Sequence, residues 1–316
     1  MSLRLATFNI ESLDWSQDQA AWFDQRAAAL RPILNTLDAD ILCLQEVNAQ
    51  HRVNDDKRSF VALLKLIEGT ALQDFHLAGS TRPRGPDPAD RHNLVILSRW
   101  PILAQRQFHH DLVPPLHWKS PEGEEIEVQF DRPALYAQIA QPGEKPLHIF
   151  NLHLRAPRAA PMPGGRQKGE WTSTRRWAEG YFTASLKRQA QALEMRLAVE
   201  DLLDREPEAR IALCGDLNAE AFEAPTRLLQ ALPDDVETTA FSARALTPLE
   251  RRVAPGQRFS VLHDGRKVLL DHILASQSLA STCQGVEIFN TGLMDEARVT
   301  SEIAGSLHAP FRALFG

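Results

Sequence analysis

Short apolar runs of strand length recur along the whole chain. In residues 3–9 the side chains of Leu3 and Leu5 point to one face and those of Ala6 and Phe8 to the other, which is typical of a β-strand. Further runs of this kind lie at 41–45, 93–98, 132–139, 147–154, 210–216, 268–275 and 311–315. The pattern predicts a protein built mainly on β-sheet.

Three segments have the spacing of an amphipathic helix, at 20–37, 173–204 and 222–232. Ser173 or Thr174 is expected to cap the longest of them. Many strands with a few helices indicate an α+β or α/β protein. The middle strands are apolar on both faces, so a sandwich of two sheets with helices outside would cover them.

No linker divides the chain. The Pro/Gly-rich stretches at 82–88 and 155–169 are interpreted as long loops. Of the 316 residues 43% are hydrophobic, enough for a substantial core, and we expect a single domain over residues 1–316.

Charge and cysteine content exclude several classes of protein. The net charge of -6 leaves no global basic surface for long nucleic acid. Three cysteines far apart in the chain argue against a disulfide framework and favour the cytoplasm. No apolar run approaches the ~20 residues of a membrane span, and no secretory signal is recognisable at the start.

Polar side chains recur at the ends of the predicted strands. They are Asn9, Glu46, Asn151, His153, Asp216, Asn218, Asp271, His272 and His308. Burying several carboxylates together is costly unless a cation neutralises them. Oxygen and amide ligands favour Mg²⁺ or Mn²⁺, whereas the sequence has no H-E-x-x-H or C-x-x-C zinc motif and no Walker loop.

The chain resembles the endonuclease/exonuclease/phosphatase superfamily, because six short motifs occur in the order typical of that family. They are T-F-N from Thr7, L-Q-E ending at Glu46, N-L-H-L from Asn151, G-D-L-N ending at Asn218, L-D-H-I around Asp271 and H-A-P from His308. The resemblance implies a four-layer αββα sandwich, with two mixed β-sheets packed face to face, and metal-assisted hydrolysis of a phosphate ester.

The resemblance also implies roles for individual residues. Glu46 is expected to be the principal metal ligand, with Asn9 beside it. His308 would orient or deprotonate the attacking water, and Asp271 would be its carboxylate partner. Asp216 would position the nucleophile or hold metal.

Other residues are expected to meet the substrate. Asn218 and His153 would bind phosphate oxygens, and Asn151 is placed with the substrate-binding residues as a support of the site. Whether His153 acts neutral or protonated stays open. His272 follows Asp271 and should face the opposite side of its strand, which favours a structural role.

One position departs from the family pattern. The family has an aspartate immediately before the last histidine, and that acid often contributes to the metal shell, whereas this chain has Leu307. Leucine cannot bind a metal, so the site is weaker, or another ligand replaces the aspartate, or catalysis is lost. Glu11 and Glu302 are candidate substitutes.

The clearest positive segment follows His153 directly, in residues 155–177. Arg155 and Arg158 lie at its start, and tryptophans occur among its cations, so it could clamp phosphates and stack on a base or sugar. The alternative is a solvated loop that leads into a helix. A second loop at 80–92 carries Arg82, Arg84, Arg91 and His92.

Three functions therefore stay open. The first is a metal-dependent phosphodiesterase or nuclease, acting on short or single-stranded nucleic acid because the net charge disfavours long duplexes. The second is a phosphomonoesterase acting on inositol, sugar or nucleotide phosphates. The third is a catalytically impaired binding relative that has lost metal affinity through Leu307.

Overall fold

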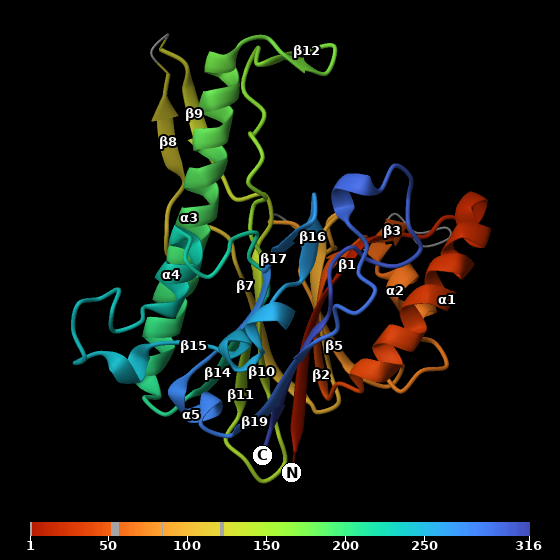
Figure 1. Cartoon of the computed structure of the whole chain (residues 1–316), viewed down its shortest axis with the longest axis vertical. Coiled ribbons are helices and arrows are strands. Elements are labelled where there is room, and N and C mark those ends of the chain that lie inside the picture. Colours follow the sequence, from red (N-terminus) through yellow and green to blue (C-terminus); the bar gives the residue numbers. More distant parts are fainter. Residues whose placement is uncertain (1, 52–56, 84, 121–122) are drawn as a thin grey trace.

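Two six-stranded mixed β-sheets form the centre of the computed structural model, which describes residues 2–51, 57–83, 85–120 and 123–316 (Figure 1). The first sheet has the order β19 (Cys283–Ile288), β20 (Phe311–Phe315), β1 (Leu3–Leu13), β2 (Ile41–Val47), β6 (Asn93–Ser98) and β5 (His76–Gly79). The second has the order β15 (Thr247–Pro248), β18 (Asp271–Ala275), β14 (Arg210–Asp216), β11 (Leu147–His153), β10 (Ala134–Ile139) and β7 (Ile102–Phe108).

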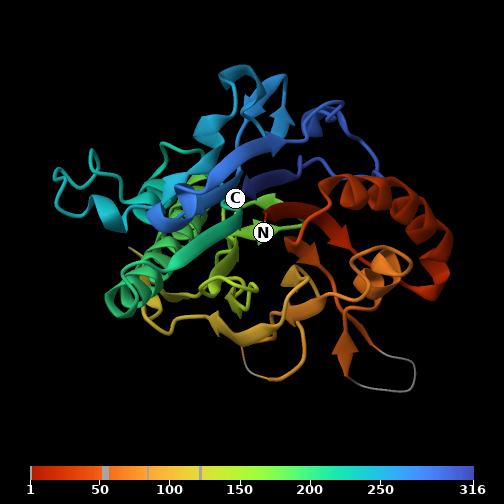
Figure 2. The ribbon, with the colours of Figure 1, turned by 90° about the horizontal axis from the view of Figure 1, so that it is seen from below.

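The helices cover the outer faces of this sandwich. On the first sheet lie α1 (Ala20–Leu37) and α2 (Val61–Ile67), and on the second lie α3 (Thr174–Arg205) and α4 (Ala224–Gln230), as the view from below shows (Figure 2). A short helix, α5 (Gln277–Ala280), follows β18. The predicted αββα sandwich is confirmed, and the described part of the chain holds no helix long and apolar enough to cross a membrane.

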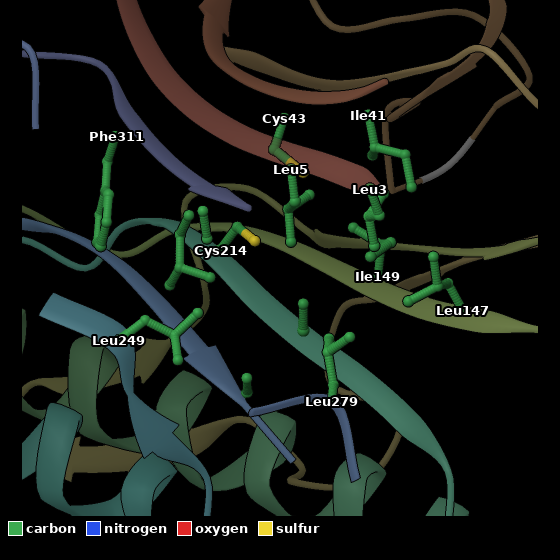
Figure 3. Packing of buried hydrophobic residues seen from close by; sticks show 14 of the residues in the cluster. Leu3, Leu5, Ile41, Cys43, Leu147, Ile149, Cys214, Leu249, Leu279 and Phe311 are labelled. Carbon is green, nitrogen blue, oxygen red and sulfur yellow. The ribbon is translucent and has the colours of Figure 1, made fainter. Parts of the chain in front are cut away.

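The core between the sheets is built from alternate positions of the strands. Leu3 and Leu5 of β1 pack there against Ile149 of β11 and Cys214 of β14 (Figure 3). The other face of β1 presents Phe8 toward α1. This alternation explains why the central strands are apolar on both faces.

Local sequence signals fix the longest helix. The Ser173 hydroxyl accepts a hydrogen bond from the Arg176 backbone N–H at 3.2 Å, which makes Ser173 the expected N-cap of α3. Met195 and Val199, one turn apart, bury the inner face of α3 against the second sheet.

An arm projects beyond the sandwich at one end of α3. It consists of the first turns of α3, the hairpin β8 (Leu116–Lys119) and β9 (Glu125–Val128), and the hairpin β12 (Arg166–Gln167) and β13 (Glu170–Trp171) (Figure 1). Two further hairpins are β3 (Gln50–His51) with β4 (Arg58–Ser59), and β16 (Val261–His263) with β17 (Arg266–Val268).

Candidate active site

The sheet topology brings the polar strand ends to one edge of the sandwich. β1 runs parallel to β2, and β11 runs parallel to β14, so their carboxyl ends carry Asn9, Glu46, His153 and Asp216. β18 runs antiparallel to β14 and begins opposite its end, where Asp271 pairs with Asp216. β20 runs antiparallel to β1, which brings the segment before β20 to the same edge.

Asn9 joins the two sheets at this edge. Its Nδ2 donates hydrogen bonds to Asp216 Oδ2 at 3.0 Å and to Glu46 Oε1 at 3.4 Å. Its Oδ1 accepts the backbone N–H of Glu11 at 3.0 Å. A single buried amide therefore links the carboxylates of β2 and β14.

Glu46 sits where the register of β2 shifts against both neighbouring strands. Its φ of 62° lies in the left-handed region, which turns its side chain out of the strand pattern. The carboxylate accepts the Ser12 backbone N–H at 3.1 Å and the Ser12 hydroxyl at 3.2 Å. On its other side, Oε1 lies 3.8 Å from His153 Nε2, and Oε2 lies 3.7 Å from His92 Nδ1.

His308 is held by Asp271, whose Oδ2 lies 2.8 Å from the imidazole Nδ1. The other ring nitrogen, Nε2, lies 3.9 Å from Asp216 Oδ2. Burial lowers the pKa of His308, but the Asp271 and Asp216 carboxylates outweigh it and raise that pKa to about 10. Burial, reinforced by Asp271, raises the pKa of Asp216 to about 7.

Arg132 was not predicted as a site residue, yet its Nη1 lies 2.5 Å from Nδ1 of His153. A guanidinium can only donate, so Nδ1 accepts, and the single ring proton of His153 sits on Nε2. Burial and the Arg132 charge lower the pKa of His153 well below its ordinary value. His153 is therefore a neutral hydrogen-bond donor, and its Nε2 lies 3.5 Å from Asp216 Oδ2.

The turn after β14 fixes Asn218. The Asn218 backbone N–H donates to Asp216 Oδ1 at 2.8 Å, and its Nδ2 donates to the Leu154 carbonyl at 3.0 Å. Gly215, with φ of 135°, allows β14 to approach β11 closely just before this turn, because a Cβ there would lie 1.9 Å from the Leu152 carbonyl oxygen.

Asn151 does not reach the cleft. Its Nδ2 donates to the carbonyl oxygens of Leu44 and Val95, at 2.9 and 3.0 Å, and its Oδ1 accepts from Gln45 at 2.7 Å. These bonds pin the two sheets together behind the site. The expectation of a substrate-binding residue is corrected, because all of its polar atoms serve these internal bonds and the side chain is fully buried.

One end of each predicted basic loop reaches the cleft. Arg155 lines it and donates to Asp131 Oδ2 at 2.9 Å, and the exposed Arg158 lines it as well. Arg91 and His92, from the second loop, line it as well. Arg84, of that loop, lies outside the described residues.

His272 faces away from the cleft, as predicted. It is fully buried, with Nδ1 2.7 Å from Glu250 Oε1 and Nε2 2.9 Å from the Ala219 carbonyl. The attraction of Glu250 outweighs burial and raises the pKa of His272. This buried pair supports the strand that carries Asp271.

The site residues open into a cleft of about 1220 Å³. Carboxylates outnumber arginines among the described residues that line it, and neither Glu46 nor Asp216 forms an ion pair with a lysine or arginine there. The oxygens of these two residues, bridged by Asn9, are hard donors. This donor set fits a divalent ion such as Mg²⁺ or Mn²⁺.

Two side-chain groups bring potential metal-binding atoms within 4.8 Å of one another. They are Glu46, His92 and His153, and Asp216, Asp271 and His308. In the first group, the proton on His153 Nε2 disfavours ligation by that nitrogen. In the second, His308 Nδ1 is taken by Asp271. The first group therefore offers the Glu46 carboxylate as an oxygen donor, and the second offers the Asp216 carboxylate.

The family model described as Endonuclease/Exonuclease/phosphatase family matches residues 6–298. The chain belongs to this family. Members of the endonuclease/exonuclease/phosphatase family hydrolyse phosphate esters, and they generally depend on a divalent metal. The match ends before His308, so the place of that residue rests on its contact with Asp271.

Solved structures share the fold of this endonuclease/exonuclease/phosphatase family member. The protein of this family from Bacteroides vulgatus is 17% identical, with a TM-score of 0.60 over 100% of this chain and 99% of that one. A mannosyl-6-phosphatase from Bacteroides thetaiotaomicron is 14% identical, with a TM-score of 0.60 over 99% and 100%. A humanized Danio rerio TDP2 is 14% identical, with a TM-score of 0.57 over 100% and 99%. The sequence comparison with curated proteins finds no match.

Proposed function

We propose that this chain is a divalent-metal-dependent phosphodiesterase that cleaves short or single-stranded nucleic acids. One observation carries the proposal, namely the His308 imidazole held by Asp271 and turned toward Asp216 in the cleft. The neighbouring Glu46 carboxylate lacks a cationic partner among the described residues, which supports the metal requirement.

Glu46 and Asn9 would hold the ion, with Asp216 on the facing sheet. A divalent ion there would stabilise negative charge on the phosphate and favour ionisation of a bound water. Because Mg²⁺ and Mn²⁺ accept the same hard oxygen donors, the proposal includes both.

His308 and Asp216 are placed to handle the proton of the attacking water. A water that contacts His308 Nε2 and Asp216 Oδ2 would be oriented by both atoms, and the pair would take up its proton. Asp271 fixes the ring orientation of His308 through Nδ1. His308 and Asp216 titrate as a pair, because both are buried and the charge of each changes the pKa of the other.

Two neutral donors are placed to bind phosphate oxygens. His153 presents Nε2–H toward Asp216, in the space where substrate would lie. The Asn218 amide lines the same cleft, and Arg155 adds positive charge along the wall. The negative charge that develops during phosphate hydrolysis would thus meet preorganised donors.

The extent of the cleft favours a diester. Its lining runs from Trp22 on one side to Arg266 on the other, so groups on both sides of a phosphate would have room. A phosphomonoesterase is the second candidate, because Arg91 and Arg155 offer positive charge for a terminal phosphate dianion.

Hydrolysis assays test the proposal directly. Purified protein would be given bis(p-nitrophenyl) phosphate, p-nitrophenyl phosphate or a single-stranded DNA oligonucleotide, with Mg²⁺ or Mn²⁺ and then with a chelator. We expect metal-dependent cleavage of the diester and the oligonucleotide, and a loss on the order of 10²- to 10⁴-fold in kcat for His308→Ala.

The matched control is His76→Ala, because His76 is exposed on the edge strand β5 and does not line the cleft. This variant should keep full activity. Faster cleavage of the monoester than of the diester would favour the phosphomonoesterase. Folded protein that cleaves none of the substrates and has no affinity for either ion would contradict enzymatic function and support a binding relative.

A further inference from the structure

The carboxylate of Glu11 lies beside the position where this chain lacks the expected acid. The Ser306 hydroxyl donates to the Asn9 carbonyl at 2.7 Å, which holds the segment before His308 against the end of β1. Glu11 lines the cleft there together with Glu46 and His308. Burial raises the pKa of Glu11, while His308 and the Leu307 backbone N–H act in the opposite direction.

The backbone around Glu11 is held in an unusual conformation. Glu11 and Ser12 have φ values of 50° and 43°, and the register of β1 against β2 shifts between Asn9 and Leu13. Consecutive left-handed residues other than glycine cost on the order of 1–3 kcal/mol each and persist only where surrounding contacts enforce them. The bulge turns the end of β1 toward the cleft.

Arg26 of α1 stabilises this conformation by binding backbone carbonyl oxygens. Its Nη1 donates to the Glu11 carbonyl at 2.7 Å, and its Nη2 donates to the Ile10 carbonyl at 2.6 Å and to the Gly305 carbonyl at 3.4 Å. The guanidinium thus binds main-chain oxygens of both segments that flank the Glu11 carboxylate. The Arg26 charge also attracts the Glu11 carboxylate, without a direct ion pair between the two side chains.

We propose that Glu11 supplies the second carboxylate for the divalent ion held by Glu46, in place of the acid that Leu307 cannot provide. The inference rests on the proposed function, since it concerns the same ion. Mg²⁺ sites in proteins commonly use one or two carboxylates and keep several waters. A carboxylate oxygen of Glu11 would replace the aspartate ligand that the family has at the position of Leu307.

The test measures metal affinity rather than turnover. Mn²⁺ binding would be followed by isothermal titration calorimetry and by the electron paramagnetic resonance of free Mn²⁺, for the wild type and for Glu11→Gln, Leu307→Asp and the double variant. We expect Glu11→Gln to weaken Mn²⁺ affinity at least about 10-fold. Adding Leu307→Asp should return the affinity toward the wild-type value.

Two further variants sharpen the result. Glu302→Gln removes the other acidic candidate, which is exposed, and should leave Mn²⁺ affinity unchanged. Glu11→Asp keeps the charge but retracts it by one methylene, so it should give an intermediate affinity even if Glu11→Gln folds poorly.

The outcomes separate this inference from the proposed function. Wild-type affinity in both Glu11→Gln and Glu11→Asp, with hydrolysis intact, would overturn the role of Glu11 alone. A loss in Glu302→Gln instead would assign the second carboxylate to that residue and would also overturn it. No Mn²⁺ binding by the wild type would overturn both proposals.

Discussion

The Nδ1 atom of His308 lies 2.8 Å from Oδ2 of Asp271, although 37 residues separate them in the chain. The contact joins the start of β18 to the segment before β20. Because a carboxylate only accepts, Asp271 holds a proton on Nδ1 and Nε2 faces Asp216 at 3.9 Å. The orientation of the His308 ring is thus fixed by contacts within the sandwich.

Asp271→Asn should disable this pair while keeping its shape. The substitution removes the carboxylate charge that raises the pKa of His308, and the amide can donate to Nδ1 and so change which ring nitrogen carries a proton. We expect kcat to fall on the order of 10²- to 10⁴-fold, with little change in the melting temperature. Steady-state kinetics on a phosphodiester, with circular dichroism as the folding control, would measure it. A kcat within about threefold of wild type would contradict the role of Asp271.

Arg132→Met should release His153 from its fixed protonation state. Without the guanidinium, the lowering of the His153 pKa by positive charge disappears and only burial and the other histidines remain. We expect the pKa of His153 to rise toward its ordinary value, as read by NMR titration of the metal-free protein. Arg106→Met, on exposed β7, is the control. An unchanged His153 pKa would show that Arg132 does not set its protonation.

Glu250→Gln should destabilise the protein in a pH-dependent way. The buried Glu250 carboxylate favours the protonated form of His272, so the pKa of His272 in the folded protein lies above the unfolded value of about 6.5. The stabilisation is therefore complete below that unfolded value and is lost as the pH rises through the folded pKa. Breaking a buried pair costs about 3–5 kcal/mol.

Urea unfolding of wild type and Glu250→Gln across a pH series would reveal this effect. The difference in the free energy of unfolding should be largest near and below the unfolded pKa and should shrink at alkaline pH. A difference that grows with pH would reverse the assigned sign.

Trp177→Ala tests whether the arm contacts an extended substrate. Trp177 is 46% exposed, lies in the first turn of α3 within the arm, and packs against Tyr181 at 5.5 Å between ring centroids. Stacking of a base on an aromatic ring contributes about 1–3 kcal/mol. KM for a single-stranded oligonucleotide should therefore rise about 5- to 100-fold, while KM for a small diester stays constant.

The control for this prediction is Phe241→Ala, which removes another exposed aromatic side chain, from a loop that does not line the cleft. It should leave both KM values unchanged. An equal effect of the two substitutions, or no effect of Trp177→Ala on the oligonucleotide, would exclude stacking at Trp177.

Periodicity in the sequence was sufficient for the longer elements. Helix α1 has the predicted bounds, and α3 differs by one residue at each end, because their apolar stripes extend over several turns. Helix α2 and the hairpin of β8 and β9 were not predicted. Their segments are too short to show a period, and tertiary packing decides them.

The site divides along similar lines. Asp216 and Asp271 could be predicted because each stands at a strand end within a motif. Arg132 could not, since it precedes an apolar run like any polar strand boundary and reaches His153 only through the register of β10 and β11. The approach of Glu11 to Leu307 depends on a bulge and on a contact between opposite ends of the chain, which no local pattern encodes.

We expect a divalent ion to bind at Glu46, at the edge where the two sheets meet. Crystals grown with Mn²⁺ and measured for anomalous scattering would test it most directly. We expect an anomalous peak about 2.0–2.4 Å from an oxygen of the Glu46 carboxylate, which disappears in Glu46→Gln crystals. A peak located elsewhere on the molecule, or none at Glu46 at saturating Mn²⁺, would contradict it.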